Sequence, residues 1–170
     1  EEVREVSICK LNLTQNAVVY DIGSGTGSVA IEIAGVPGGV QVYAIERKPE
    51  AVELLRKNRE HFHMDNIQII EATAPEGLEE LPVPTHAFIG GSGGRLLDIL
   101  QTLYRKNPHM RIVINAISME TIAELKEVLD TFPVEEEEIL QMQVSRVKKL
   151  LSYHLPQAEN PVWICSFMFR

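Results

Sequence analysis

The chain has 170 residues, 45% of them hydrophobic and 24% charged, with a formal net charge of −8. This length matches one domain that buries about two-thirds of the surface its unfolded chain exposes. The absence of a long apolar run or signal peptide indicates a soluble, cytoplasmic protein, and the acidic balance opposes non-specific binding to nucleic acid, which depends on clustered Lys and Arg.

The first predicted element is a short helix within residues 1–13. Val3, Val6, Ile8 and Leu11 recur at roughly helical spacing, and the acidic residues come first with Lys10 near the end, as the helix dipole favours. The chain starts on two glutamates with no initiator methionine, so further residues are expected before Glu1.

A glycine-rich turn is predicted between a strand over residues 18–21 and a helix over residues 26–35. The turn reads D-x-G-x-G-x-G over residues 21–27. Glycine lets the backbone pass close to a ligand, and the next helix directs its free N–H groups and positive dipole end into the same crevice. A ligand site is therefore expected here, although similar turns without a ligand are common.

The spacing of this turn bears on the kind of ligand. A dinucleotide site requires G-x-G-x-x-G, but its third glycine is replaced by Ser28, and a carboxylate at Asp21 would repel a pyrophosphate. An ammonium or sulfonium ligand is favoured instead. The strand, turn and helix resemble motif I of the S-adenosylmethionine-dependent methyltransferases. The expected cofactor contacts in the turn are Asp21, Gly23, Ser24, Gly25, Thr26 and Gly27.

The second and third strands are predicted to border the same site. The strand over residues 40–46 ends on Glu46, 19 residues beyond Gly27, where an acid can accept both hydroxyls of a ribose; a solvated strand end is the alternative. Pro49 suits the first turn of the next helix. After the strand over residues 66–71, Thr73 and Ala74 lie where an adenine ring would be held, unless this loop is a plain turn before Pro75.

A second glycine run, residues 90–94, follows the strand predicted over His86–Ile89. It either exposes backbone to a large flat ligand or acts as a flexible linker, and its place at a strand end favours the ligand. Gly90 is assigned to the cofactor. Ser92 and Arg95 are the candidates for lining a substrate cleft, ahead of a helix over residues 96–106.

The remaining elements complete an α/β pattern. A strand over residues 110–116, a helix begun by Ser118, and a strand over residues 135–144 are followed by a polar hairpin and a last strand from Asn160 onward. The four glutamates 135–138 are read as the solvated start of their strand. His154 is read as an ordinary hairpin residue, and Cys9 and Cys165 as two reduced, buried thiols that bind no metal.

Strands alternating with helices predict a doubly wound, Rossmann-like sheet with its ligands at the carboxyl ends of the strands. The segments EVREVSICKL, DIGSGTGSVAIEIA, VYAIERKPEAVELLRKN, APEGL, FIGGSGGRL, VINAISMET and NPVWI are, in this order, similar to the cobalt-precorrin-6B (carbon-15) methyltransferase family. The resemblance spans essentially the whole chain. It implies a class I methyltransferase fold, with a mostly parallel seven-stranded sheet and one antiparallel strand near the C-terminus.

The resemblance also implies a decarboxylating methyl transfer from S-adenosylmethionine to a corrinoid ring in cobalamin biosynthesis. It assigns the glycine turn to the methionine part, Glu46 to the ribose and Ala74 to the adenine region. It further implies a homo-oligomer, a tetramer in related proteins, and either a stand-alone domain over residues 1–170 or the C-terminal domain of a bifunctional protein. The usual Thr-Lys before EVR would lie upstream of Glu1, and Thr73 replaces the more usual Asp.

Two other functions stay open on the sequence. One is an RNA or tRNA methyltransferase of the same fold, against which the acidity counts; the other is a catalytically silent nucleoside-binding subunit, against which the intact glycine turn and Glu46 count. No general acid or base is assigned. A corrinoid substrate is expected, and neither nucleic acid, a membrane nor a bound metal is expected.

Overall fold

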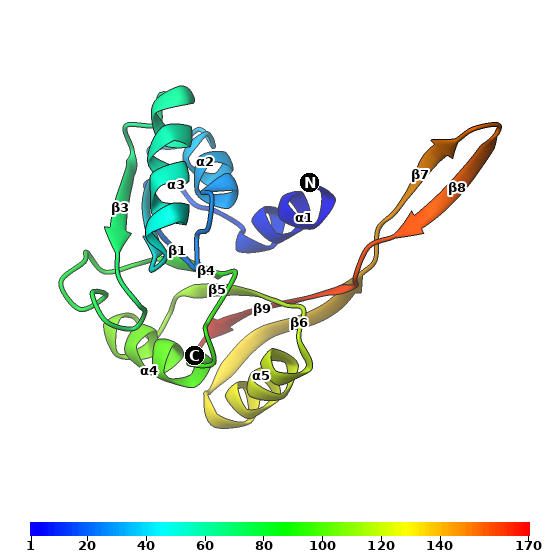
Figure 1. Cartoon of the computed structure of the whole chain (residues 1–170). Helices are drawn as coiled ribbons and strands as arrows, with labels where there is room; N and C mark the ends of the chain where they lie inside the picture. Colours follow the sequence, from blue (N-terminus) through cyan, green and yellow to red (C-terminus); the bar gives the residue numbers. More distant parts are fainter.

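The computed structural model describes all of residues 1–170, in five helices and nine strands (Figure 1). The helices are α1 (Glu2–Leu11), α2 (Ser28–Ala34), α3 (Pro49–His61), α4 (Leu96–Lys106) and α5 (Met119–Thr131). The strands are β1 (Val18–Ile22), β2 (Gln41–Glu46), β3 (Ile67–Glu71), β4 (His86–Ile89), β5 (Arg111–Ala116), β6 (Val134–Met142), β7 (Ser145–Leu150), β8 (Tyr153–Ala158) and β9 (Val162–Phe169).

Seven of the strands form one sheet in the order β3-β2-β1-β4-β5-β9-β6. Strand β1 pairs in parallel with β2 and β4, which aligns Ile22 with Ile45 on one side and Ile89 on the other. Strand β9 runs antiparallel to both of its neighbours, β5 and β6. This topology confirms the predicted Rossmann-like fold, and it brings the carboxyl ends of β1, β2, β4 and β5 to one edge.

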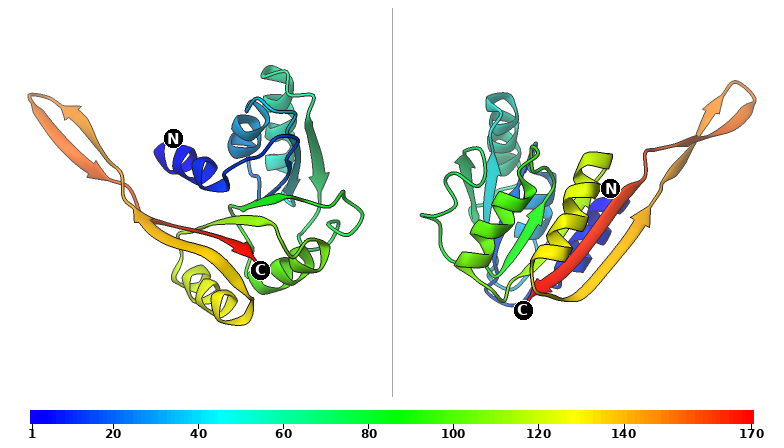
Figure 2. Two further views of the ribbon diagram at one scale, coloured as in Figure 1. Left: turned by 180° about the vertical axis from the view of Figure 1, so that it is seen from behind. Right: turned by 90° about the horizontal axis from the view of Figure 1, so that it is seen from below.

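Helices cover both faces of the sheet, so the strands at its centre are buried (Figures 1 and 2). One core lies between the sheet and α4 and α5, and includes Tyr20, Leu100 and Phe167. The other lies between the sheet and α1 to α3, and includes Leu11 and Leu55. The near-continuous apolar runs of the central strands follow from this arrangement, because both of their faces are covered.

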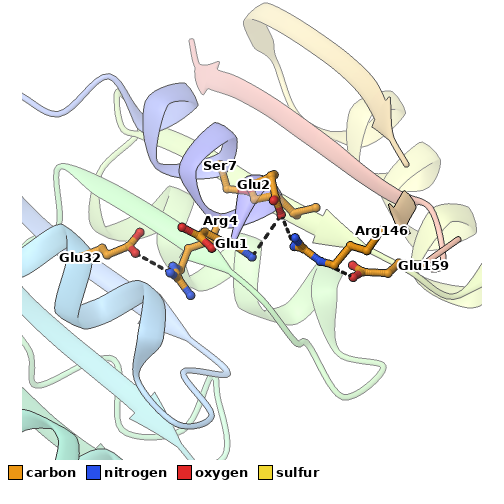
Figure 3. A network of polar contacts seen from close by, with 8 residues as sticks. Glu1, Glu2, Arg4, Ser7, Glu32, Arg146 and Glu159 are labelled. Carbon is orange, nitrogen blue, oxygen red and sulfur yellow. Dashed lines mark hydrogen bonds and ion pairs between the residues drawn. The ribbon is translucent and has the colours of Figure 1, made fainter. Parts of the chain in front are cut away.

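Ion pairs connect helix α1 to three separate elements. Arg4 pairs with Glu32 of α2 at 2.6 Å, and Lys10 pairs with Glu138 of β6 at 2.6 Å. Figure 3 shows the third connection, in which Arg146 at the start of β7 lies between Glu2 of α1 and Glu159 after β8, at 2.6 and 3.0 Å. The short helix is therefore tied to the body of the protein by charge as well as by the buried Leu11.

Strands β7 and β8 form a separate two-stranded ribbon that projects from the end of β6 and β9 (Figures 1 and 2). The predicted polar hairpin is confirmed, and every residue of both strands is exposed. The prediction for residues 135–138 is confirmed as well. These glutamates are exposed on β6, the edge strand, where a bulge between Glu135 and Glu138 interrupts the pairing with β9.

The prediction of two buried thiols is wrong for one of them. Cys165 is buried on β9, and burial raises its pKa to about 12. Cys9 is exposed, because it lies on the side of α1 opposite the buried Leu11 and Ser7. None of the helices combines the length and apolar character required to cross a membrane.

Candidate active site

Two pockets lie at the carboxyl edge of the sheet and share the backbone of Gly23 and Gly25. The first, called here the Glu46 pocket, has a volume of about 330 Å³, and the second, the Asp21 pocket, about 370 Å³. Together they have the size expected of a site for a small molecule. The Glu46 pocket is lined by Ile22, Gly23, Gly25, Ile45, Glu46, Arg47, Lys48, Ala51, Ala72, Thr73, Ala74, Gly91, Ser92, Gly93 and Arg95. The Asp21 pocket is lined by Val3, Asp21, Gly23, Ser24, Gly25, Thr26, Ser28, Val29, Phe88, Gly90, Asn115, Ile117 and Val162.

The three glycines of the turn have positive φ angles but serve different purposes. A Cβ atom at Gly23 (φ 74°) would lie 2.6 Å from the carbonyl oxygen of Gly91, so the backbones of the two glycine-rich loops touch. At Gly25 (φ 59°) the space is open, because no atom lies within 4 Å of such a Cβ. Gly25 is therefore the point at which the turn presents bare backbone to a ligand.

Gly27 lines neither pocket. It is buried at the N-cap of α2 with φ 82°, and a Cβ there would overlap Cδ1 of the buried Leu55. The third glycine thus allows α3 to pack closely against the start of α2. This is a packing role, similar to that of the last glycine in a dinucleotide motif.

Asp21 is a buried carboxylate that is only partly satisfied. Its Oδ2 accepts a hydrogen bond from the Ser24 hydroxyl at 2.6 Å, whereas its Oδ1 is buried without a hydrogen-bond partner. Burial raises the pKa of Asp21 from an ordinary 3.8 to about 6, although the Ser24 hydroxyl and the N–H of Ala30 at the start of α2 oppose that rise. An incompletely satisfied carboxylate facing a pocket favours a ligand that brings a donor or a positive charge.

Glu46 organises the opposite side of the turn. Its Oε2 accepts from the Gly25 N–H at 2.8 Å, and its Oε1 accepts from the N–H groups of Arg47 and Lys48 at 2.9 Å. With only 8% of its surface exposed, Glu46 is not a solvated strand end. The carboxylate joins the end of β2 to the glycine turn and retains lone pairs that can accept from a ligand.

Thr73 and Ala74 lie on the far wall of the Glu46 pocket. Ala74 is 8% exposed and packs in the core, whereas Thr73 is exposed and its hydroxyl makes no hydrogen bond within the chain. Gly90 lines the Asp21 pocket, while Ser92 of the same loop lines the Glu46 pocket, with its hydroxyl 3.5 Å from Glu124 of α5. The second glycine run therefore borders both pockets.

Arg95 is engaged within the chain rather than free to bind a ligand. Its Nη1 donates to both oxygens of Glu76, at 2.8 and 2.7 Å, and its Nε donates to Asp98 at 3.4 Å. These carboxylates raise its pKa further. The guanidinium borders the Glu46 pocket and connects the loop after β3 to the start of α4.

Several residues at the site were not singled out from the sequence. Arg47 forms no ion pair, and its guanidinium lies about 3.6 Å from where a Cβ of Gly93 would be. Its position directly after Glu46 is the signal that identifies it. Asn115 lines the Asp21 pocket, and its Oδ1 lies 3.0 Å from the hydroxyl of Ser7 in α1. That contact spans 108 residues, and nothing local predicts it.

The fold, the glycine turn and the two acids together define a Rossmann-like methyltransferase that uses S-adenosylmethionine. The residues fit that molecule. The open space at Gly25 accepts a ligand that lies across the turn, Glu46 can accept from ribose hydroxyls, and the unsatisfied Asp21 Oδ1 suits a cationic methionine part.

Comparison with known proteins narrows this class. The sequence model of a protein family, described as the precorrin methyltransferase domain, matches residues 1–168 of this chain. The cobalt-precorrin-6B C(15)-methyltransferase (decarboxylating) of Salmonella typhimurium is 33% identical over 96% of this chain and 85% of its own. The chain belongs to the precorrin methyltransferase family.

Solved structures of precorrin enzymes agree with this family membership. The precorrin-6y C5,15-methyltransferase of Geobacter metallireducens superposes with a TM-score of 0.91 at 36% identity, covering 98% of this chain and 88% of its own. The precorrin 8W decarboxylase of Methanobacterium thermoautotrophicum gives 0.87 at 35% identity, covering 97% and 88%. The tRNA (m1A58) methyltransferase of Aquifex aeolicus, at 16% identity and a TM-score of 0.74, shares the fold alone.

Proposed function

We propose that this protein methylates carbon 15 of a precorrin or cobalt-precorrin macrocycle and removes carbon dioxide from its acetate side chain, in cobalamin biosynthesis. The full-length similarity to the Salmonella enzyme, whose name states this reaction, carries the proposal. When bound, S-adenosylmethionine supplies an electrophilic methyl group on its sulfonium. The residues of both pockets then hold the two reactants in place.

Glu46 accepts the ribose hydroxyls, and Thr73 and Ala74 border the adenine, with the Thr73 hydroxyl able to meet its edge. The Asp21 pocket takes the methionine part, with backbone contacts from Gly23, Ser24, Gly25, Thr26 and Gly90. The carboxylate of Asp21 stabilises positive charge there, and it does so strongly because the site is buried.

Positioning accounts for most of the rate in this proposal. The ring carbon must be held about 3 to 3.5 Å from the methyl group, in line with the bond that breaks. Loss of carbon dioxide leaves its bonding electrons to the conjugated macrocycle, so neither step requires a strong base. We accordingly assign no general acid or base to this chain.

Incubation with precorrin-6B or cobalt-precorrin-6B and S-adenosylmethionine tests the reaction directly. Mass spectrometry should show a product that has gained one methyl group and lost one carbon dioxide. The two substrates in parallel also establish whether cobalt is required. Methylation of RNA under the same conditions, with no change in either corrinoid, would contradict the proposal.

We further propose that residues 1–170, as a single domain, associate into a homo-oligomer, and the hairpin of β7 and β8 supports the association. An isolated two-stranded hairpin is at best marginally stable in water. Five of the eleven large exposed apolar side chains of the chain lie on it, Val147, Leu150, Leu151, Tyr153 and Leu155. A second copy of this chain is the partner we propose for these residues, and neither nucleic acid nor a membrane is part of the assembly.

A further inference from the structure

Two large apolar side chains are exposed at the junction of β5 and α5. Ala116, the last residue of β5, is buried, but Ile117 is 74% exposed and Met119, the first residue of α5, is 76% exposed. Between them, Ser118 caps the helix by accepting a hydrogen bond from the Thr121 N–H at 3.2 Å. The cap stabilises the start of α5, directly after Ile117.

This apolar surface is continuous with the site. Ile117 lines the Asp21 pocket together with the apolar side chains of Phe88 and Val162. The junction lies at the carboxyl edge of the sheet, where β5 follows β4. Ile117 therefore joins the exposed apolar surface to the Asp21 pocket, and Met119 lies two residues further along the chain, outside both pockets.

The distribution of charge indicates which part of a substrate this surface accepts. No Lys or Arg lines the Asp21 pocket, and the carboxylate of Asp21 is buried within it. Arg47, Lys48 and Arg95 all border the Glu46 pocket instead. A peripheral carboxylate of a macrocycle would find no cation in the Asp21 pocket, whereas an uncharged ring face would meet apolar surface.

We infer that Ile117 and Met119 form a platform on which the flat face of the macrocyclic substrate lies, with the reacting ring carbon directed into the Asp21 pocket. This inference rests on the proposed function. It assigns the exposed surface of these two residues to the substrate. Ile117 also lines the Asp21 pocket, which takes the methionine part, but 74% of its surface is exposed. The adenosine part of the cofactor occupies the Glu46 pocket, which neither residue lines.

The test compares Ile117→Ser/Met119→Ser with the unaltered protein. Burial of two apolar side chains against the ring predicts a rise of about tenfold or more in KM for cobalt-precorrin-6B. The Kd for S-adenosylhomocysteine, measured by calorimetry, should change by less than about threefold. Ile117→Val/Met119→Leu retains the apolar surface and should keep KM near that of the unaltered protein.

Val83→Ser is the matched control, because Val83 is 59% exposed and lines neither pocket. An unchanged KM in the double serine variant would overturn the inference. So would an equal loss of affinity for S-adenosylhomocysteine, or a loss of oligomer mass without a change in KM, which would make the patch a subunit contact. If the unaltered protein binds S-adenosylhomocysteine but converts no precorrin, the proposed function fails and this inference with it.

Discussion

The ionised carboxylate of Asp21 destabilises the folded protein because it is buried, and a cationic ligand can offset this loss of stability. Its pKa is higher in the folded protein than in the unfolded chain, so the folded state binds the proton more tightly. The contribution of Asp21 to the free energy of unfolding is therefore highest below the ordinary pKa of 3.8, falls as the pH rises toward about 6, and stays low above that. A cation beside the carboxylate would reverse this penalty.

Asp21→Asn should separate stability from binding. A rise in pKa from 3.8 to about 6 corresponds to roughly 3 kcal/mol, so at pH 7 the variant should gain up to about that free energy of unfolding. The same change should weaken the binding of S-adenosylhomocysteine. It should also remove the increase in affinity that we expect of the unaltered protein as the pH rises past 6 and Asp21 becomes ionised. Urea denaturation and calorimetry at pH 5 and pH 8 measure both effects. An affinity that depends equally on pH in the variant would contradict this role.

Glu46→Ala should lower cofactor affinity by about 2 to 4 kcal/mol, because it removes a charged acceptor and releases three backbone donors. Glu71 offers a matched control. It pairs in register with Glu46 at the end of β3, yet it is exposed and meets only Arg56, at 3.3 Å. Glu71→Ala should leave the Kd for S-adenosylhomocysteine unchanged. Equal effects of the two substitutions on this Kd would show that Glu46 does not contact the cofactor.

Among the elements, the two glycine-rich loops depend on one another. Gly23 and Gly91 meet backbone to backbone, but only one side of this contact requires glycine. Gly23 has φ 74°, and a Cβ there would lie 2.6 Å from the carbonyl oxygen of Gly91. A Cβ at Gly91 would have no atom within 4 Å. The loop after β4 therefore packs on the turn after β1, which sets the geometry of both pockets.

Gly23→Ala should thus lower the free energy of unfolding by about 1 to 3 kcal/mol, from the left-handed backbone conformation alone, and more if the loops separate. Gly91→Ala should change it by less than about 0.5 kcal/mol, as surface substitutions usually do. Chemical denaturation of both variants without ligand makes the comparison. Similar losses for the two would show that the loops do not pack as described.

At the scale of the whole molecule, the ribbon of β7 and β8 projects too far to be stabilised by its own core (Figure 2). Leu150 and Tyr153 are opposite one another across the ribbon, and Leu155 is opposite Lys148. All three apolar side chains lie on the same face, because directly paired residues share a face and alternate residues return to it. That face is the best candidate for contact with a second chain.

Tyr153→Ser/Leu155→Ser should therefore reduce the oligomer to monomer. Size-exclusion chromatography with light scattering gives the mass, and Val83→Ser serves again as a control for loss of an exposed apolar side chain. The midpoint of thermal unfolding should fall only to the extent that assembly stabilises the unaltered protein. A monomeric unaltered protein, or an oligomer that survives the double substitution, would contradict the proposal.

Local patterns were sufficient for most of the fold. The predicted helix over residues 96–106 and strand over His86–Ile89 match α4 and β4, and the cap at Ser118 and first-turn Pro49 are where the residue types favour them. These features depend on neighbours a few residues away. The seven-stranded sheet with one antiparallel strand near the C-terminus, which no local pattern contains, agreed with what the family resemblance implied.

Contacts between distant residues were not predictable in the same way. Arg95 was predicted to line a substrate cleft, and that stays a prediction. Its ion pair with Glu76, 19 residues earlier, was not predicted, because folding brings that loop alongside the start of α4. Cys9 is exposed because of the side of α1 that packs on the sheet. In both cases the surroundings of the side chain depend on segments that are distant in the sequence.

The class of fold, the glycine turn after β1 and the acids at the ends of β1 and β2 could be predicted from the sequence, because periodicity, glycine and charge act over short stretches of chain. Three contacts became known only from the folded structure: Gly23 meets Gly91, Gly27 makes room for Leu55, and Asn115 and Ile117 line the Asp21 pocket. Each of them depends on how segments remote in sequence pack, because the backbone of one segment limits the space that is left for the side chains of the other.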